Sequence, residues 1–175
     1  RSFSLVPVEV DLAHAAEGAV TAAQPQAERH GLTYSVTVPD QRVTVSADPE
    51  RLGQVIANLL ENAQRFAHTS VAVSVRGRGD RAELAVEDDG PGIADEDLPH
   101  VFERLYVSAH RPTRSENGSG LGLAIVQQLV SAMGGTVRAE RAASGGARLV
   151  VSLPAATAPT AGAPVPSGSR GDPYR

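Results

Sequence analysis

The strongest constraint on the fold of this chain is an amphipathic helix predicted over residues 48–67. Asp48 is a typical helix N-cap, and Pro49 suits the first helical position, where no backbone N–H is needed. Apolar side chains then recur at helical spacing, so they form one stripe that must be buried against another layer. This stripe consists of Leu52, Val55, Ile56, Leu59, Ala63 and Phe66.

Strands predicted on both sides of this helix supply the second layer. They are expected at residues 6–10, 32–38, 43–46, 71–78, 82–88, 136–140 and 148–153. Further helices are expected at 11–29, weakened or kinked near Pro25, and at 121–133, with a short one at 96–102. Helices packed on one face of a mixed sheet make an α+β fold, a two-layer α/β sandwich.

One folded domain is expected over residues 1–154. Residues 155–175 are mostly Ala, Pro, Thr, Gly and Ser, a composition that buries little and predicts a disordered tail. No apolar run is long enough to span a membrane, so no membrane contact is expected. The chain begins at Arg1 without an initiator Met or a signal peptide, which indicates a piece of a larger protein.

Composition excludes several kinds of chemistry. All 16 basic residues are Arg, and without Lys there can be no Walker A loop, protein-kinase fold or Schiff base. The absence of cysteine excludes disulfides, thiolate metal sites and cysteine nucleophiles. A net charge of −4 gives no reason to expect nucleic acid.

A second stripe on the 48–67 helix is polar. Asn58, Asn62 and Arg65 follow one another at i, i+4 and i+7, beside the apolar stripe. Two amide oxygens and a guanidinium in this position suit a magnesium ion and phosphates. On spacing alone, a solvated flank of the helix explains the same residues.

An acidic, glycine-rich turn follows the strand at 82–88. Its residues are Asp88-Asp89-Gly90-Pro91-Gly92-Ile93. The glycines permit a tight turn and close approach to a flat ligand. A carboxylate leaving the strand could accept a hydrogen bond from the amine of adenine, whereas guanine presents a carbonyl there. Alone, the motif favours an ordinary acidic Gly/Pro turn.

A long loop and a second glycine-rich segment come next. Residues 89–120 form a loop of about 30 residues, which is uncommon in a compact domain and predicts a lid. The run Gly118-Ser119-Gly120-Leu121-Gly122-Leu123 then enters a helix. Free N–H groups at a helix N-terminus bind anions, although the run by itself is weak evidence for phosphate.

These motifs occur in the order found in one family. Together they resemble the Asn box and two glycine boxes of the ATP-binding catalytic domain of sensor histidine kinases. That domain has the Bergerat fold, shared with gyrase, heat-shock chaperone and mismatch-repair ATPases. Residues 51–63, RLGQVIANLLENA, are similar to the kinase branch, and residues 102–106, FERLY, lie where the kinases carry a Phe box. The resemblance covers roughly residues 8–154.

The resemblance implies ATP and Mg²⁺ as ligands and assigns roles to the motif residues. Asn62, supported by Asn58, would hold the magnesium ion. Nucleotide would be bound by Asn58, Asn62, Arg65, Phe66, Asp88, Gly90, Gly92, Ile93, Arg104, Gly118, Ser119, Gly120, Leu121, Gly122 and Leu123. The chain departs from many relatives at Val107, Ala147 and Asn117, which lie in or near the lid, the last hairpin and the second glycine segment.

Phosphoryl transfer is favoured over hydrolysis. Hydrolytic relatives carry a Glu four residues before the magnesium Asn, where this chain has Asn58, and Glu61 is expected to face solvent. None of the five histidines has the acidic neighbour of an acceptor, so no catalytic residue is expected within the fragment.

The expected partners are the protein's own dimerisation and histidine-acceptor domain and a response regulator, on the cytoplasmic side of the membrane. An anti-sigma-factor-type serine kinase and a nucleotide-binding module without transfer activity are the alternatives.

Overall fold

The computed structural model describes residues 5–103 and 121–156. Predictions for Arg104, Val107, Asn117, Gly118, Ser119 and Gly120, for most of the lid and for the tail from residue 157 onward lie outside these ranges. None of the described helices is both long and apolar enough to cross a lipid bilayer.

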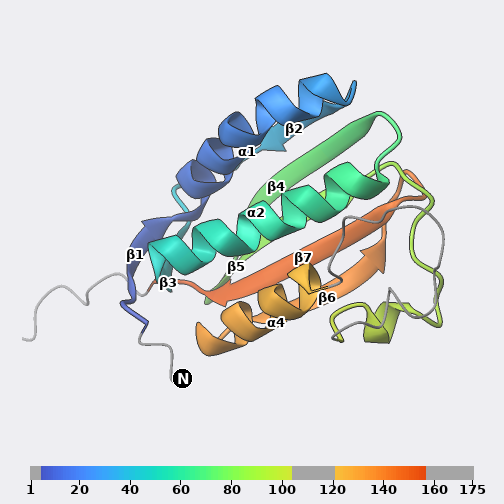
Figure 1. Cartoon of the computed structure of the whole chain (residues 1–175). Helices are drawn as coiled ribbons and strands as arrows, with labels where there is room; N and C mark the ends of the chain where they lie inside the picture. The colour runs from blue at the N-terminus through green and yellow to red at the C-terminus, as the bar shows by residue number, and fades with distance from the viewer. Residues whose placement is uncertain (1–4, 104–120, 157–175) are drawn as a thin grey trace, which may run out of the picture.

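A five-stranded mixed sheet forms one layer of the domain (Figure 1). Its strand order is β2 (Thr33–Thr37), β4 (Ser70–Arg78), β5 (Arg81–Asp88), β7 (Ala147–Pro154) and β6 (Thr136–Arg141). Only β2 and β4 run parallel, and the remaining neighbours are antiparallel. The predicted turn between β4 and β5 is present, with Gly79 at a φ of 66°, a value that glycine adopts readily.

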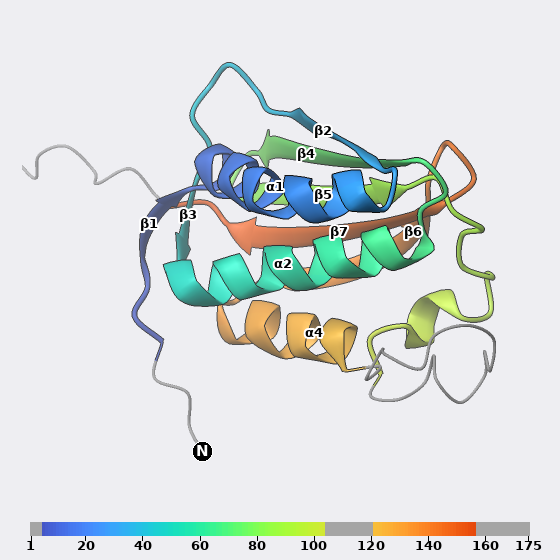
Figure 2. The ribbon, with the colours of Figure 1, turned by 45° about the horizontal axis from the view of Figure 1, so that its top comes forward.

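In the part of the chain that the structure describes, three helices form the other layer, side by side on one face of the sheet (Figure 2). They are α1 (Leu12–Arg29), α2 (Pro49–Phe66) and α4 (Gly122–Ala132). The predicted α+β sandwich is therefore confirmed. Helix α1 continues past Pro25 to Arg29, and the predicted short helix is a single 3₁₀ turn, η1 (Leu98–His100).

Helix α2 begins as the sequence predicted. The Asp48 carboxylate accepts hydrogen bonds from the backbone N–H groups of Glu50 (3.0 Å) and Arg51 (3.1 Å). The same carboxylate accepts one from the N–H of Val6 (3.0 Å), just before β1 (Val8–Asp11). Strand β1 pairs antiparallel with β3 (Thr44–Ala47) in a small second sheet. The Asp48 carboxylate thus fixes the start of α2 and also holds the segment at Val6 that leads into β1.

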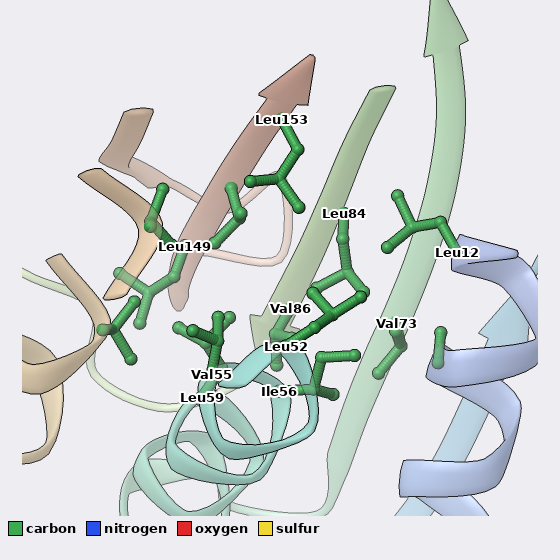
Figure 3. Close-up of a cluster of buried hydrophobic side chains, with 14 of the residues drawn as sticks. Leu12, Leu52, Val55, Ile56, Leu59, Val73, Leu84, Val86, Leu149 and Leu153 are labelled. Atoms are coloured by element: carbon green, nitrogen blue, oxygen red, sulfur yellow. The ribbon is translucent and has the colours of Figure 1, made fainter. Parts of the chain in front are cut away.

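The hydrophobic core lies between α2 and the main sheet (Figure 3). The apolar stripe of α2 is almost fully buried from Leu52 to Ala63, against strand residues such as Val73, Leu84 and Leu149, whereas Phe66 at the end of the helix is only half-buried. Burying a leucine or valine side chain contributes about 1.5–3 kcal/mol, so this contact is the main stabilising interaction of the domain. It also determines which side of α2 carries the polar stripe.

Among the described residues, two buried polar side-chain atoms have no hydrogen-bond partner, the Tyr34 hydroxyl and Nδ2 of Asn58. The Tyr34 hydroxyl, on β2, has no hydrogen bond within the described ranges. Because an unsatisfied buried hydroxyl costs free energy, Tyr34→Phe should leave the free energy of unfolding unchanged or raise it by about 1 kcal/mol. Chemical denaturation of the two proteins, with comparison of their midpoints, checks this. A large loss of stability would reveal a partner for the hydroxyl.

Candidate functional site

The polar stripe of α2 borders the core. Asn58 and Asn62 are both half-buried, one helical turn apart, next to fully buried apolar positions. Arg65 lies beyond them with its side chain 32% exposed, and its Nη2 atom is 3.6 Å from Oε1 of Glu61. The Glu61 side chain is 68% exposed, as predicted for a residue that points away from Asn62.

Asn58 faces the start of α4. A Cβ atom placed on Gly122 would lie 3.9 Å from Oδ1 of Asn58. The Nδ2 atom of Asn58 is buried, and no described residue hydrogen-bonds to it. The first residues of α4 carry no side-chain cap, so N–H groups of its first turn have no acceptor within the helix. A buried amide N–H and a helix N-terminus that no described side chain caps together suit an anionic ligand.

Asp88, at the end of β5, is 4% exposed. Its Oδ1 atom accepts hydrogen bonds from the N–H groups of Gly90 (2.9 Å) and Ala147 (3.3 Å). No described residue hydrogen-bonds to Oδ2. Burial raises the pKa of the Asp88 carboxyl, although the two N–H donors oppose this effect. The carboxylate is therefore held rigidly and partly dehydrated, with one oxygen left for a ligand.

Glycines pack around Asp88 so closely that no side chain fits. A Cβ atom on Gly90 would overlap the carbonyl oxygen of Phe66, and one on Gly146 would overlap the carbonyl oxygen of Asp88. Gly92 has a φ of 75°, and a Cβ there would lie 2.5 Å from the carbonyl oxygen of Gly145. The turn between β6 and β7 therefore lines this site together with the end of α2 and the turn after β5.

Two clusters result from the predicted site residues. Phe66, Asp88, Gly90 and Gly92 meet at the C-terminal end of α2, and Asn58 meets Gly122 at the start of α4. Asn62 lies one turn before Phe66, about 6 Å along the helix axis. Ile93 packs against the core, and Leu121 and Leu123 are half-buried at the start of α4.

Sequence reasoning missed two parts of the site. The turn at residues 144–147 was noted only as a departure at Ala147, although its paired glycines were a signal of close backbone approach. Ser144 Oγ also donates to the carbonyl oxygen of Asp88 (3.3 Å). Asp89 was given no role, and the structure places its carboxylate against the segment that follows α2.

The chain belongs to a known family: residues 47–157 match the "Histidine kinase-, DNA gyrase B-, and HSP90-like ATPase" family. Among curated proteins it is similar to the sensor protein RstB of Escherichia coli K12, with 47% identity over 134 residues. That match covers 71% of this chain and 31% of RstB, so the chain spans about a third of this relative.

Comparison with solved structures gives the same family. Full-length ShkA in complex with AMPPNP superposes with a TM-score of 0.78 at 29% identity, covering 90% of this chain and 33% of ShkA. The mycobacterial sensor histidine kinase MprB gives 0.72 at 30% identity, covering 86% of this chain and 98% of that structure. In sequence and fold this chain is the histidine kinase type of ATP-binding catalytic domain, and the anti-sigma-factor kinase alternative is not favoured.

Proposed function

We propose that this domain binds ATP with Mg²⁺ and donates the γ-phosphoryl group to a histidine on a separate dimerisation and acceptor domain. The observation that carries the proposal is the pairing of two half-sites. Buried Asp88 offers a carboxylate oxygen, to which no described residue hydrogen-bonds, for the amine of adenine. Asn58 and the start of α4, where Leu121 makes no side-chain cap hydrogen bond, offer a place for phosphates.

The residues present fit a magnesium ion. Mg²⁺ takes a few oxygen ligands and keeps several waters, so an amide oxygen and phosphate oxygens suffice. Asn62, supported by Asn58, would hold the ion, which when bound neutralises phosphate charge during transfer. The buried Nδ2 of Asn58, to which no described residue hydrogen-bonds, is a donor and suits a phosphate oxygen beside such an ion. Within the described ranges, no group of three or more His, Asp or Glu side chains forms a metal site.

Water is a poor acceptor in this site. The residue four positions before Asn62 is Asn58, whose amide is not a base. Glu61 is mostly exposed and ion-paired with Arg65. In the proposed reaction, an imidazole nitrogen of the acceptor forms the P–N bond, the P–O bond to the β-phosphate breaks, and ADP leaves. The domain contributes positioning and charge neutralisation.

In this proposal the acceptor domain and a response regulator are the protein partners, and the domain works on the cytoplasmic side of the membrane. ATP-binding would involve the residues assigned above, including Arg104, Gly118, Ser119 and Gly120 from the segment before α4.

A labelling experiment tests the transfer. Incubated alone with γ-labelled ATP, the chain should acquire no stable label and should release phosphate very slowly, because it lacks both an acceptor and a general base. Addition of the acceptor hairpin of the same sensor kinase should yield acid-labile label on the hairpin. Stable label on the isolated chain, or rapid hydrolysis, would contradict the proposal. Nucleotide binding without any transfer would instead support a binding module.

A further inference from the structure

Asp89 follows Asp88 but makes a separate set of contacts. Its carboxylate accepts hydrogen bonds from the N–H groups of His68 (2.8 Å), Thr69 (3.1 Å to each oxygen) and Ser70 (3.2 Å). It also accepts one from the Thr69 hydroxyl. These donors hold the pKa of Asp89 well below its ordinary value, the Thr69 hydroxyl most of all. Asp89 is therefore ionised at any pH at which the domain works.

The donors come from the segment that leaves α2. The helix ends at Phe66, and Ala67 has an extended conformation with φ −57° and ψ 143°. The N–H groups of residues 68–70 therefore have no helical acceptors, and the Asp89 carboxylate takes that place. The backbone N–H of Asp89 returns a hydrogen bond to the carbonyl oxygen of Ser70 (3.3 Å). Charge-assisted bonds of this kind are roughly twice as strong as neutral ones.

Asp89 thus ties two parts of the site together. On one side, Gly90 packs against the carbonyl oxygen of Phe66 with no room for a Cβ. On the other, Asp88 is held in place by Gly90 and Ala147. Asn62 lies one helical turn before Phe66. The contacts of Asp89, together with the pairing of Val71 with Asp88, therefore link the Asn62 end of α2 to the Asp88 carboxylate.

We propose that Asp89 is a positioning residue that sets the spacing between the metal-and-phosphate half-site on α2 and the adenine half-site at Asp88. This inference rests on the proposed function. A ligand that spans both half-sites gains affinity only if the two are held at the right separation. A ligand that touches one half-site does not depend on that separation.

The test compares ligands that span one or two half-sites. Dissociation constants for Mg-ADP and for adenosine are measured by calorimetry or NMR titration, under conditions where circular dichroism shows every variant folded. Asp89→Asn removes one acceptor oxygen and the charge. Thr69→Val removes only the hydroxyl donor. Asp80→Asn makes the same chemical change on an exposed side chain at the opposite end of β4 and β5 and is the matched control.

For Asp89→Asn, the expected result is Mg-ADP binding about tenfold weaker or more, with adenosine binding within about twofold of wild type. Thr69→Val should also weaken Mg-ADP binding, but less than Asp89→Asn does. If Asp89→Asn does not fold, Thr69→Val is compared with the wild type instead. Asp80→Asn should match wild type. Equal losses for both ligands would show a purely structural role and overturn the inference, as would unchanged Mg-ADP binding. Failure of the wild-type chain to bind Mg-ADP would overturn the proposed function itself.

Discussion

Replacing Asn62 with alanine is expected to lower phosphoryl transfer to a supplied acceptor hairpin by about 100-fold or more, the order of loss when one group that stabilises transferring charge is removed. Asn62 is half-buried beside the apolar stripe, so its removal opens no cavity in the core. Alanine is also the better helix former, by up to about 0.7 kcal/mol. Loss of transfer should therefore occur in a protein at least as stable as the wild type.

The measurement is the initial rate of label transfer across a range of Mg²⁺ concentrations. Because Asn62 is assigned to the metal, raising Mg²⁺ should partly restore the rate. Gln54→Ala, another exchange of an amide for alanine on α2 but at an exposed position, should keep the wild-type rate. Transfer by Asn62→Ala at the wild-type rate would show that Asn62 has no role in holding the metal.

Asp88→Ala is expected to weaken ATP binding by about 10- to 100-fold and to erase the preference for ATP over GTP, because a lost hydrogen bond to a charged group costs about 1.5–3 kcal/mol. Asp88→Asn is the sharper variant. Its amide oxygen can still accept from Gly90 and Ala147. Its NH₂ group would then face the nucleotide, where it repels the amine of adenine and suits the carbonyl of guanine. Calorimetric titration with both nucleotides checks the shift, and equal affinity of the wild type for GTP would contradict the assignment.

Asp88→Asn should not lower the free energy of unfolding. Burial raises the pKa of Asp88 in the folded chain above its value in the unfolded chain. Protonation of Asp88 therefore favours the folded state at low pH, and this contribution is lost as the pH rises through the raised pKa. At neutral pH the buried charge is unfavourable for folding, so Asp88→Asn should unfold at the same or a higher denaturant concentration than wild type. In the proposed function, Asp88 would thus lower the stability of the fold in exchange for recognition of the base.

The fold was predictable because its signals are local. The Asp48 cap, the apolar stripe of α2 and the Gly79 turn each depend on a few consecutive residues. The structure confirms all three, except that Phe66, predicted in the stripe, is only half-buried. The parallel pairing of β2 with β4 and the pairing of β5 with β7 have no such signal, because they join segments far apart in the sequence.

In the candidate site, too, local features could be predicted from the sequence and long-range contacts could not. Asp88 and Gly90 could be assigned from their place after a strand, since the motif itself is contiguous. The bonds from Ala147 to Asp88 and from Thr69 to Asp89 could not, because they span 59 and 20 residues. Nothing in the spacing of the acidic turn indicated that its two adjacent carboxylates contact different parts of the chain.

The close packing at Gly90 and Gly146 has a consequence for inhibition. One route to drug resistance is a larger residue in the wall of a pocket, so that the compound no longer fits while the natural ligand does. At these two glycines even a methyl group would overlap backbone carbonyl oxygens of the protein itself. If the proposed adenine site is occupied by a competing compound, substitutions at these two glycines would therefore damage the fold of the site before they reject the compound.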